Sequence, residues 1–270
     1  MGQIESRYII QSVSRALDLL NLLGGNEAGM SLTEICQCLS LRPASAFKLL
    51  ATLEAHDYVQ KNPHGGRYFM GVASVQLGLT VLRANNIREI AVPILKKLRD
   101  DCKETVHLAS LTGTRVIYLE RLDSLMPVGY LHSHVGMAAP AHCTALGKAI
   151  MAFWPSDEIR RAYAHTPLVR LTPKTITDIK KLLAELDRTR KRGYAVDNEE
   201  AQLTVKCLAV PLQVNLARPT WSISVTGPAE RIDRLIAKNQ LASMLKMAAK
   251  EISDRIAVVS RETAAEVSDC

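Results

Sequence analysis

The sequence lacks the features of a membrane-spanning or secreted protein. No apolar run among its 270 residues approaches the ~20 residues needed to cross a bilayer. The N-terminal segment, MGQIESRYIIQS, carries an acidic residue and has no long apolar core, which argues against a secretory signal. We therefore expect a cytoplasmic protein that has no membrane partner.

Metal-binding and catalytic motifs are also missing. The six cysteines form no C-x-x-C pair and no cysteine–histidine spacing of a zinc site, so we expect no metal, no cofactor and no disulfide. Nothing resembles a nucleophile elbow or a phosphate-binding loop. Cys143 beside His142, or Cys207 with Asp197, would supply a nucleophile and its helper residue. Adjacent side chains, however, rarely face each other productively. An enzyme is therefore not expected.

The chain also lacks a strongly basic N-terminal region. Its formal net charge is +7, yet the first 89 residues hold eight lysines and arginines against seven aspartates and glutamates, so this part is only +1. Nucleic-acid contacts there must come from a few well-placed side chains and backbone N–H groups. An apolar content of 47% and a charged content of 23% are typical of a soluble globular protein of one large or two ordinary domains.

The most informative segment, residues 31–71, predicts a helix, a short turn, a second helix and two strands. Apolar residues at positions 32, 35, 36 and 39 share one helix face. Ser31 or Thr33 is suited to cap that helix, and Pro43 suits the first turn of the next. Strands are expected at Asp57–Gln60 and Arg67–Met70, joined by a Gly-Gly turn. A preceding helix at residues 12–23, with apolar residues at positions 13, 16, 17, 20 and 23, would supply the third side of the core. This order is that of a winged helix-turn-helix.

The second helix of this segment has two faces. One is apolar, at positions 46, 49, 50 and 53, and the other carries Ser45, Lys48 and Thr52. The apolar face would pack on the domain, while the polar face offers one cation and two hydroxyls to phosphates and base edges. The hairpin would bring Lys61, His64 and Arg67 near the DNA backbone. A small helical bundle that has a hairpin and no ligand explains the pattern equally well.

Residues 72, 75, 79 and 82 are apolar and spaced as an a/d seam. They predict a helix over residues 72–88 that connects two domains and helps to pair two subunits; the alternative is a helix packed on its own domain. The next helix is expected near Ala91–Lys103, with Pro93 just inside it.

Strands and helices alternate downstream, which predicts an α+β sensor domain with a central antiparallel sheet. The strands are expected at residues 104–111, 115–122, 128–134, 194–197, 205–214 and 220–226. The helices are expected at residues 144–153, 156–164 and 175–192, followed by one long final helix from Pro228 to about Ile256.

Residues 140–148 place a strand or loop directly before a helix. Thr144 is suited to the N-cap, so the N–H groups of Ala145, Leu146 and Gly147 would point outward at the positive end of the helix dipole and could bind an anion. An ordinary capped helix has the same pattern and binds nothing.

A second candidate ligand surface lies on a later strand. Ser222, Ser224 and Thr226 alternate along the strand and give it one polar face. That face suits a hydroxyl-bearing ligand or, equally, solvent.

Several runs of residues resemble one known family. SVSRALDLLNLL, SLTEICQCLSL, LLATLEAHDYV and GGRYFMG occur in the order and at the spacing of the N-terminal domain of IclR-type transcriptional regulators. PAHCTALGKAIMAF, LTPKTITD, RGYAVDNEE, CLAVP and ISVTGPAERI resemble successive signatures of the effector domain of that family. The resemblance covers about Ser12 to Ile256.

The resemblance implies an all-α/winged helix-turn-helix N-terminal domain plus an α+β GAF-like C-terminal effector-binding domain, joined by a linker helix. The expected divisions are an N-terminal tail (1–11), the DNA-binding domain (12–71), the linker helix (72–89), the effector domain (90–256) and a C-terminal tail (257–270). The chain would be a sequence-specific DNA-binding repressor or activator. As a homodimer, or a homotetramer, it would bind a palindromic operator under the control of a small organic acid, a carboxylate.

Site residues follow from the same resemblance. The DNA-binding candidates are Arg42, Ala44, Ser45, Lys48, Thr52, Lys61 and Arg67. The effector-binding candidates are Ala145, Leu146, Gly147, Asp197, Cys207, Ser222, Ser224 and Thr226. Met126, Tyr130 and His132 would reach the effector or serve packing. An alternative function is a thiol-based redox-sensing regulator that uses Cys143 or Cys207.

The chain departs from the family pattern at both sites. The family usually has proline or glycine at position 42 and serine–threonine at positions 44 and 45, whereas this chain has its proline at position 43 and lacks one hydroxyl. Lys48 stands where arginine is common and is less suited to bidentate base recognition. Thr204 replaces a usual glycine, and residues 215–219 replace a turn that usually contains aspartate and glycine. The identities of the operator and the effector therefore cannot be inferred from the family.

Overall fold

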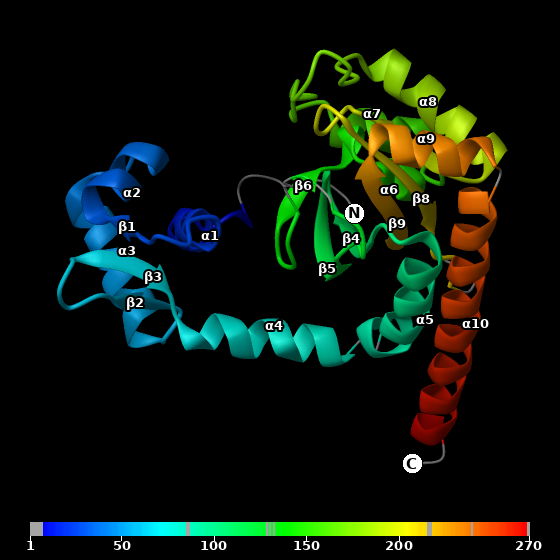
Figure 1. Cartoon of the computed structure of the whole chain (residues 1–270). Helices are drawn as coiled ribbons and strands as arrows, with labels where there is room; N and C mark the ends of the chain where they lie inside the picture. The colour runs from blue at the N-terminus through cyan, green and yellow to red at the C-terminus, as the bar shows by residue number, and fades with distance from the viewer. Residues whose placement is uncertain are drawn as a thin grey trace. The chain divides into compact units, whose positions relative to one another are not determined.

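The computed structural model describes residues 8–84, 87–127, 129, 131, 133–214, 218–238 and 240–268. Contacts divide the chain into two compact units, Met1–Asn85 and Asn86–Cys270 (Figure 1). Each unit has its own hydrophobic core. No helix of the described residues is long and apolar enough to cross a membrane.

The first unit is a winged helix-turn-helix. Its helices are α1 (Gln11–Gly24), α2 (Leu32–Leu39), α3 (Pro43–Ala55) and α4 (Val72–Ala84), and its strands are β1 (Met30–Ser31), β2 (Val59–Lys61) and β3 (Arg67–Met70). The strands pair antiparallel in the order β1-β3-β2. The predicted hairpin is confirmed, and β1 adds a third strand that the sequence pattern did not predict.

Local interactions explain where α2 and α3 begin. Ser31 Oγ accepts a hydrogen bond from the Glu34 N–H at 3.3 Å, and the Glu34 carboxylate accepts one from the Ser31 N–H at 2.7 Å. This capping box satisfies two N–H groups that would otherwise lack partners, so Ser31 rather than Thr33 is the cap. Pro43 occupies the first turn of α3, as expected.

The first helix faces the core differently from the prediction. Leu19 and Leu23 are buried, whereas Val13 and Leu17 are more than half exposed. The predicted stripe of residues 13, 16, 17, 20 and 23 is therefore wrong in part, because the buried face is rotated to include Leu19.

The connecting helix is shorter than predicted. It ends at Ala84, and α5 (Ile87–Cys102) begins before the expected Ala91, so Pro93 lies inside the helix rather than at its start. Ile87 is buried in the core of the second unit. Residues 87–89, expected in the linker, therefore belong to the packing of the second unit.

The second unit is built on a six-stranded antiparallel sheet of order β6-β5-β4-β9-β8-β7. The strands are β4 (Thr105–Thr112), β5 (Arg115–Leu122), β6 (Ala138–Pro140), β7 (Ala195–Asn198), β8 (Val205–Pro211) and β9 (Trp221–Pro228). The helices besides α5 are η2 (Ala141–Cys143), α6 (Ala145–Met151), α7 (Ser156–Ala162), α8 (Ile179–Arg192), α9 (Ala229–Ala237) and α10 (Gln240–Ser268).

Strand alternation gives this sheet two apolar faces. Leu108, Val210 and Ile223 point to a core shared with α5, α9 and α10. Ala109 and Ala209 point to a second core shared with α6 and α8. The predicted α+β fold with a central antiparallel sheet is thus confirmed, and the face toward α6 is the one that carries the candidate ligand residues.

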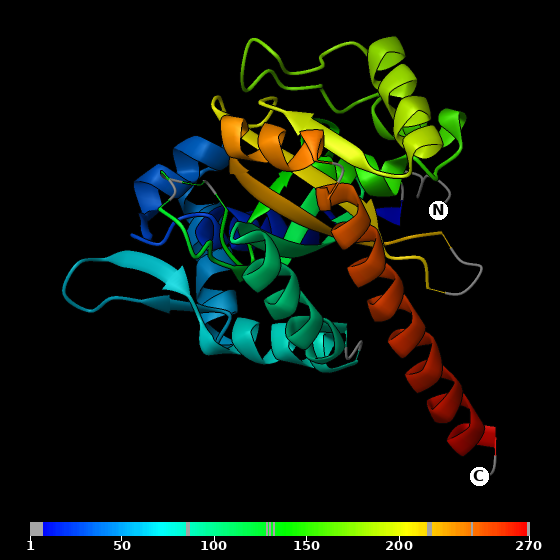
Figure 2. The ribbon, with the colours of Figure 1, turned by 45° about the vertical axis from the view of Figure 1, so that its right-hand side comes forward.

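Three predicted elements of this unit need correction. The final helix is two helices, and α10 continues to Ser268, where a tail was expected (Figure 2). The helix expected from Thr175 begins at Ile179, because Asp178 Oδ1 caps it by accepting from the Lys181 N–H at 2.9 Å. Residues 128, 130 and 132 of the strand expected at 128–134 lie outside the described residues, and its described residues form no strand.

Candidate ligand cavity and nucleic-acid interface

The second unit contains a cavity of about 400 Å³ between the sheet and the start of α6. That volume lies within the range of small-molecule sites in proteins. Six of the eight expected effector residues line it: Ala145, Leu146, Asp197, Cys207, Ser224 and Thr226. They come from α6, β7, β8 and β9, so the fold brings together segments that are far apart in the sequence.

The other two expected residues support the cavity without lining it. The Gly147 N–H donates to Thr144 Oγ1 at 3.2 Å, so it is not available to a ligand. A Cβ at Gly147 would lie 2.3 Å from the Ala141 carbonyl oxygen, so the glycine serves the packing of η2 on α6. Ser222 Oγ donates to the Leu146 carbonyl at 3.1 Å and fastens β9 to α6.

A buried histidine forms the centre of the polar floor of the cavity. His107 Nδ1 lies 3.3 Å from Ser224 Oγ and 3.4 Å from Thr226 Oγ1, and its Nε2 lies 3.0 Å from Ser133 Oγ. Burial, assisted by the positive charge of Arg121, lowers the pKa of His107 to about 3. The imidazole is therefore neutral near pH 7, with one nitrogen a donor and the other an acceptor.

Sequence reasoning missed His107 and Tyr118, which both line the cavity. A signal was present for the histidine, because it is the only ionisable residue of its strand. Its cross-strand partner is Ser224, one of the predicted residues. That pairing becomes visible only once the strand order is known.

Asp197 is the acidic group of the cavity. Its Oδ1 accepts from the Glu200 N–H at 2.7 Å and from the Ala201 N–H at 3.3 Å. Burial raises its pKa from an ordinary 3.8 to about 7, although the positive charge of Lys148 acts in the opposite direction. Asp197 therefore gains or loses its proton near neutral pH.

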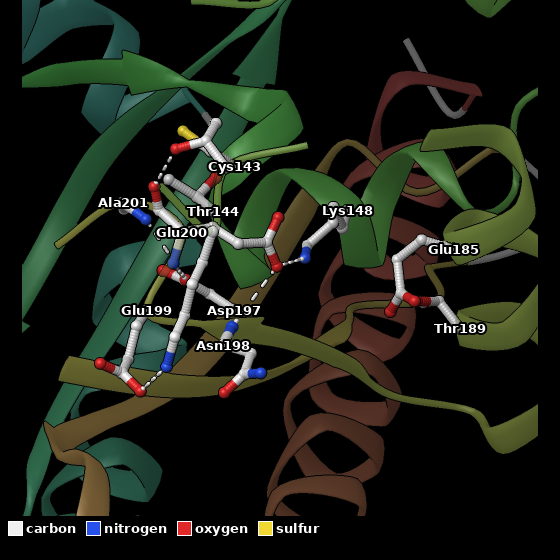
Figure 3. A network of polar contacts seen from close by, with 12 residues as sticks. Cys143, Thr144, Lys148, Glu185, Thr189, Asp197, Asn198, Glu199, Glu200 and Ala201 are labelled. Carbon is white, nitrogen blue, oxygen red and sulfur yellow. Dashed lines mark hydrogen bonds and ion pairs between the residues drawn. The ribbon is translucent and has the colours of Figure 1, made fainter. Parts of the chain in front are cut away.

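An ion pair lies behind this carboxyl group. Lys148 on α6 is fully buried, and its Nζ lies 2.5 Å from Glu200 Oε1. Figure 3 shows this ion pair. The Glu200 carbonyl oxygen in turn accepts from Thr175 Oγ1 at 2.7 Å. One buried cation thus serves two buried carboxyl groups, which is a further reason why Asp197 holds its proton.

The two candidate redox thiols lie in this same buried environment. Burial raises the pKa of Cys143 to about 12 and raises that of Cys207 well above its ordinary value; Asp197 adds to both effects. Because the thiolate is the reactive form of cysteine, neither site is activated for redox chemistry.

The remaining candidates near the cavity are less informative. Met126 does not line it and is about half exposed, and its N–H donates to Ser124 Oγ at 3.0 Å. Tyr130 and His132 lie outside the described residues. Among the described residues, no group of three or more histidine, cysteine or acidic side chains could hold a metal ion.

The first unit presents most of the DNA-binding candidates on one helix. Arg42, Ala44, Lys48 and Thr52 are exposed at or along α3, while Ser45 is half-buried. The predicted apolar stripe is confirmed, with Ala46 and Leu50 fully buried. Thr52 Oγ1 donates to the Lys48 carbonyl at 2.8 Å, so only its acceptor side is open. Phe47, which the sequence reasoning passed over, is 53% exposed beside Lys48.

The two wing cations differ in their surroundings. Lys61 is exposed, with its Nζ 5.4 Å from the centre of the Tyr68 ring. Arg67 instead donates to the Gly29 carbonyl at 2.9 Å and forms an ion pair with Glu34 at 3.0 Å. Arg67 therefore joins the wing to the capping box of α2, and its place among the DNA-binding residues stays a prediction.

A winged helix-turn-helix linked to an α/β unit with an internal cavity defines a class of DNA-binding transcriptional regulators. The family model for the IclR helix-turn-helix domain matches residues 12–63. The model for the bacterial transcriptional regulator IclR C-terminal domain matches residues 79–254. The chain belongs to the IclR family, which consists of transcriptional regulators and not of enzymes.

Individual relatives agree with this assignment. The regulator XynR of Escherichia coli is 32% identical over 225 residues, which cover 83% of this chain and 89% of XynR. BhcR of Paracoccus denitrificans is 30% identical over 246 residues, 90% of this chain and 86% of BhcR. Crystal structures show the same fold, including IclR of Thermotoga maritima (TM-score 0.64, 31% identity, 91% of this chain and 98% of that one). An IclR homolog from Microbacterium hydrocarbonoxydans, complexed with 4-hydroxybenzoate, superposes with a TM-score of 0.76 at 20% identity, over 91% of this chain and 99% of that one.

Proposed function

We propose that this regulator binds a palindromic operator as a dimer, or a tetramer of two dimers, and that a small organic acid in the cavity controls the binding. The observation that carries the proposal is the cavity itself. It is lined by the neutral imidazole of His107, by the hydroxyls of Ser224 and Thr226, and by the start of α6. The Ser224 hydroxyl and the N–H groups at the start of α6 can donate hydrogen bonds to an anion, while apolar side chains around them exclude water.

The described residues that line the cavity include no lysine or arginine, and this limits how an acid is held. A carboxylate would be bound by neutral donors, as anions are at many helix N-termini. A bound carboxylate would also lie near Asp197. Because two negative charges repel each other, Asp197 must then keep its proton. An effector that carries a hydroxyl as well as a carboxylate could use Asp197 as a hydrogen-bond partner.

Subunit pairing through α4 is part of the proposal. Val72, Val75 and Leu79 are 72%, 59% and 45% exposed, which is unusual for three apolar residues on one helical seam. Covering this seam with the same seam of a second copy would remove it from water. A dimer would also present two copies of α3 to two half-sites of the operator.

The redox alternative has weaker support. Both Cys143 and Cys207 are held in the thiol form by their surroundings. Alkylation of these two residues without loss of the response to the acid would exclude that alternative.

The proposal is tested in two steps with purified protein. Genomic footprinting identifies the operator, and a thermal-shift screen of organic acids identifies the effector, since a ligand that binds only the native state raises the melting temperature. The acid that raises it should also change operator affinity in a gel-shift assay. Asp197→Asn and Ser224→Ala should retain operator binding and change the response to the acid. An absence of any preferred DNA site would refute the central part of the proposal.

A further inference from the structure

Tyr118, like His107, is a large polar side chain of the cavity that the family resemblance did not bring forward. It lies on β5 and is 9% exposed. Its backbone is held on both sides, because its N–H donates to the Met137 carbonyl at 3.0 Å and its own carbonyl accepts from the Gly136 N–H at 2.8 Å. Its ring packs against the ring of His107 with 5.1 Å between the two centres. The phenol is therefore fixed in position before any ligand arrives.

The hydroxyl of Tyr118 forms no hydrogen bond with any of the described residues, although the residue lines the cavity. Its neighbours on the cavity floor are already engaged. His107 lies among three hydroxyls, and Thr226 Oγ1 donates to Cys207 Sγ at 3.1 Å. A phenol that lines a ligand cavity and is not engaged by the described residues has its hydrogen available to a group of the ligand.

The surroundings of Tyr118 keep it a donor. Burial raises the pKa of its hydroxyl above the ordinary 10, and the nearby Cys207 and Asp197 act in the same direction. The phenol thus stays protonated at any pH at which the protein works. Hydrogen bonds to an ionised acceptor are about twice as strong as bonds to a neutral one. A fixed, uncharged donor in a water-poor cavity therefore favours a carboxylate oxygen over an amide or ketone oxygen.

We propose that Tyr118 is a specificity-determining residue of the effector cavity, and that its phenol donates a hydrogen bond to the carboxylate of the effector. This inference rests on the proposed function, since it assumes that the cavity binds an organic acid. It adds to that function a residue that selects acids over neutral molecules of the same shape.

The test compares two acid–amide pairs of different size, benzoate with benzamide and lactate with lactamide, by isothermal titration. The wild-type chain should bind the acid of at least one pair more tightly than its amide. Tyr118→Phe should weaken binding of that acid tenfold or more, and should leave the affinity for the amide within about twofold, because loss of a bond to a charged group costs more than loss of a bond to a neutral one.

Tyr163→Phe is the matched control. Tyr163 also has a hydroxyl in this unit, 3.6 Å from Met151 Sδ, but it does not line the cavity, so its loss should not change acid binding. Equal binding of the acid by wild type and Tyr118→Phe would overturn the role of Tyr118 and leave the acid-binding function standing. Failure of the wild type to prefer either acid over its amide would overturn both.

Discussion

The buried carboxyl group of Asp197 makes a quantitative prediction about stability. Its pKa is 3.8 in an unfolded chain and about 7 in the folded protein. Between these values the folded protein keeps a proton that the unfolded chain releases. The protonated Asp197 therefore contributes its full share to the free energy of unfolding below pH 3.8, and this contribution is lost as the pH rises through about 7. At ~1.4 kcal/mol per pH unit, the loss amounts to about 4 kcal/mol.

Asp197→Asn should remove this dependence. The asparagine carbonyl can still accept from the Glu200 and Ala201 N–H groups, and Lys148 then faces one carboxylate instead of two. The variant should match the wild type near pH 4 and exceed its free energy of unfolding by up to about 4 kcal/mol at pH 8.

Urea unfolding followed by tryptophan fluorescence is the suitable assay. The only two tryptophans, Trp154 and Trp221, lie in the second unit, so the signal reports that unit alone. The control is Asp187→Asn, which removes a surface carboxylate 3.7 Å from Arg190 and should change stability by less than about 1 kcal/mol at any pH. If the difference between Asp197→Asn and wild type were the same at pH 5 and pH 8, the assigned titration of Asp197 would be wrong.

Four further outcomes are expected. Lys148→Met should cost about 3–5 kcal/mol, because it leaves Glu200 buried without its cation, and Lys148→Met with Glu200→Gln should recover most of the loss in urea unfolding. Gly147→Ala should lower the melting temperature of the effector unit, whereas Gly78→Ala, which has nothing within 4 Å of its added Cβ, should raise helix stability by about 0.5–1 kcal/mol. Lys48→Ala should weaken operator binding and reduce its salt dependence while leaving the circular dichroism melt unchanged; Arg67→Ala should lower that melt, because it breaks the contacts to Gly29 and Glu34. Phe47→Ala should relax base preference in a selection from random DNA without changing affinity for non-specific DNA, and an unchanged preference would remove Phe47 from the reading surface.

The sequence predicted the first unit well because its signals are local. The capping box of Ser31 and Glu34 spans three residues, and Pro43 marks the next helix by itself. The rotation of α1 was harder to foresee, since Val13 and Leu17 are as apolar as the residues that the core buries. Apolar character alone does not say which face meets the sheet.

The candidate ligand cavity shows where local patterns reach their limit. Asp197 and Cys207 entered through the family resemblance, and Ser224 through strand alternation, and all three line the cavity. Alternation predicted Ser222 equally, because its strand face is the same. The difference between the two serines is that Ser222 lies opposite the Leu146 carbonyl and is engaged by it. That depends on how α6 packs on the sheet.

The charge cluster behind the cavity depends on long-range packing even more. Lys148 and Glu200 lie 52 residues apart in the sequence, and neither local sequence pattern indicates that the two side chains are in contact. A lysine in an otherwise apolar helix would ordinarily be expected at the surface. Its burial is possible only because the turn after β7 brings Glu200 to it, and that same turn orients Asp197 through the Glu200 N–H. Burial raises the pKa of Asp197, and the charges of this pair outside the cavity adjust it further, so changes to Lys148 or Glu200 should alter acid binding without touching the ligand.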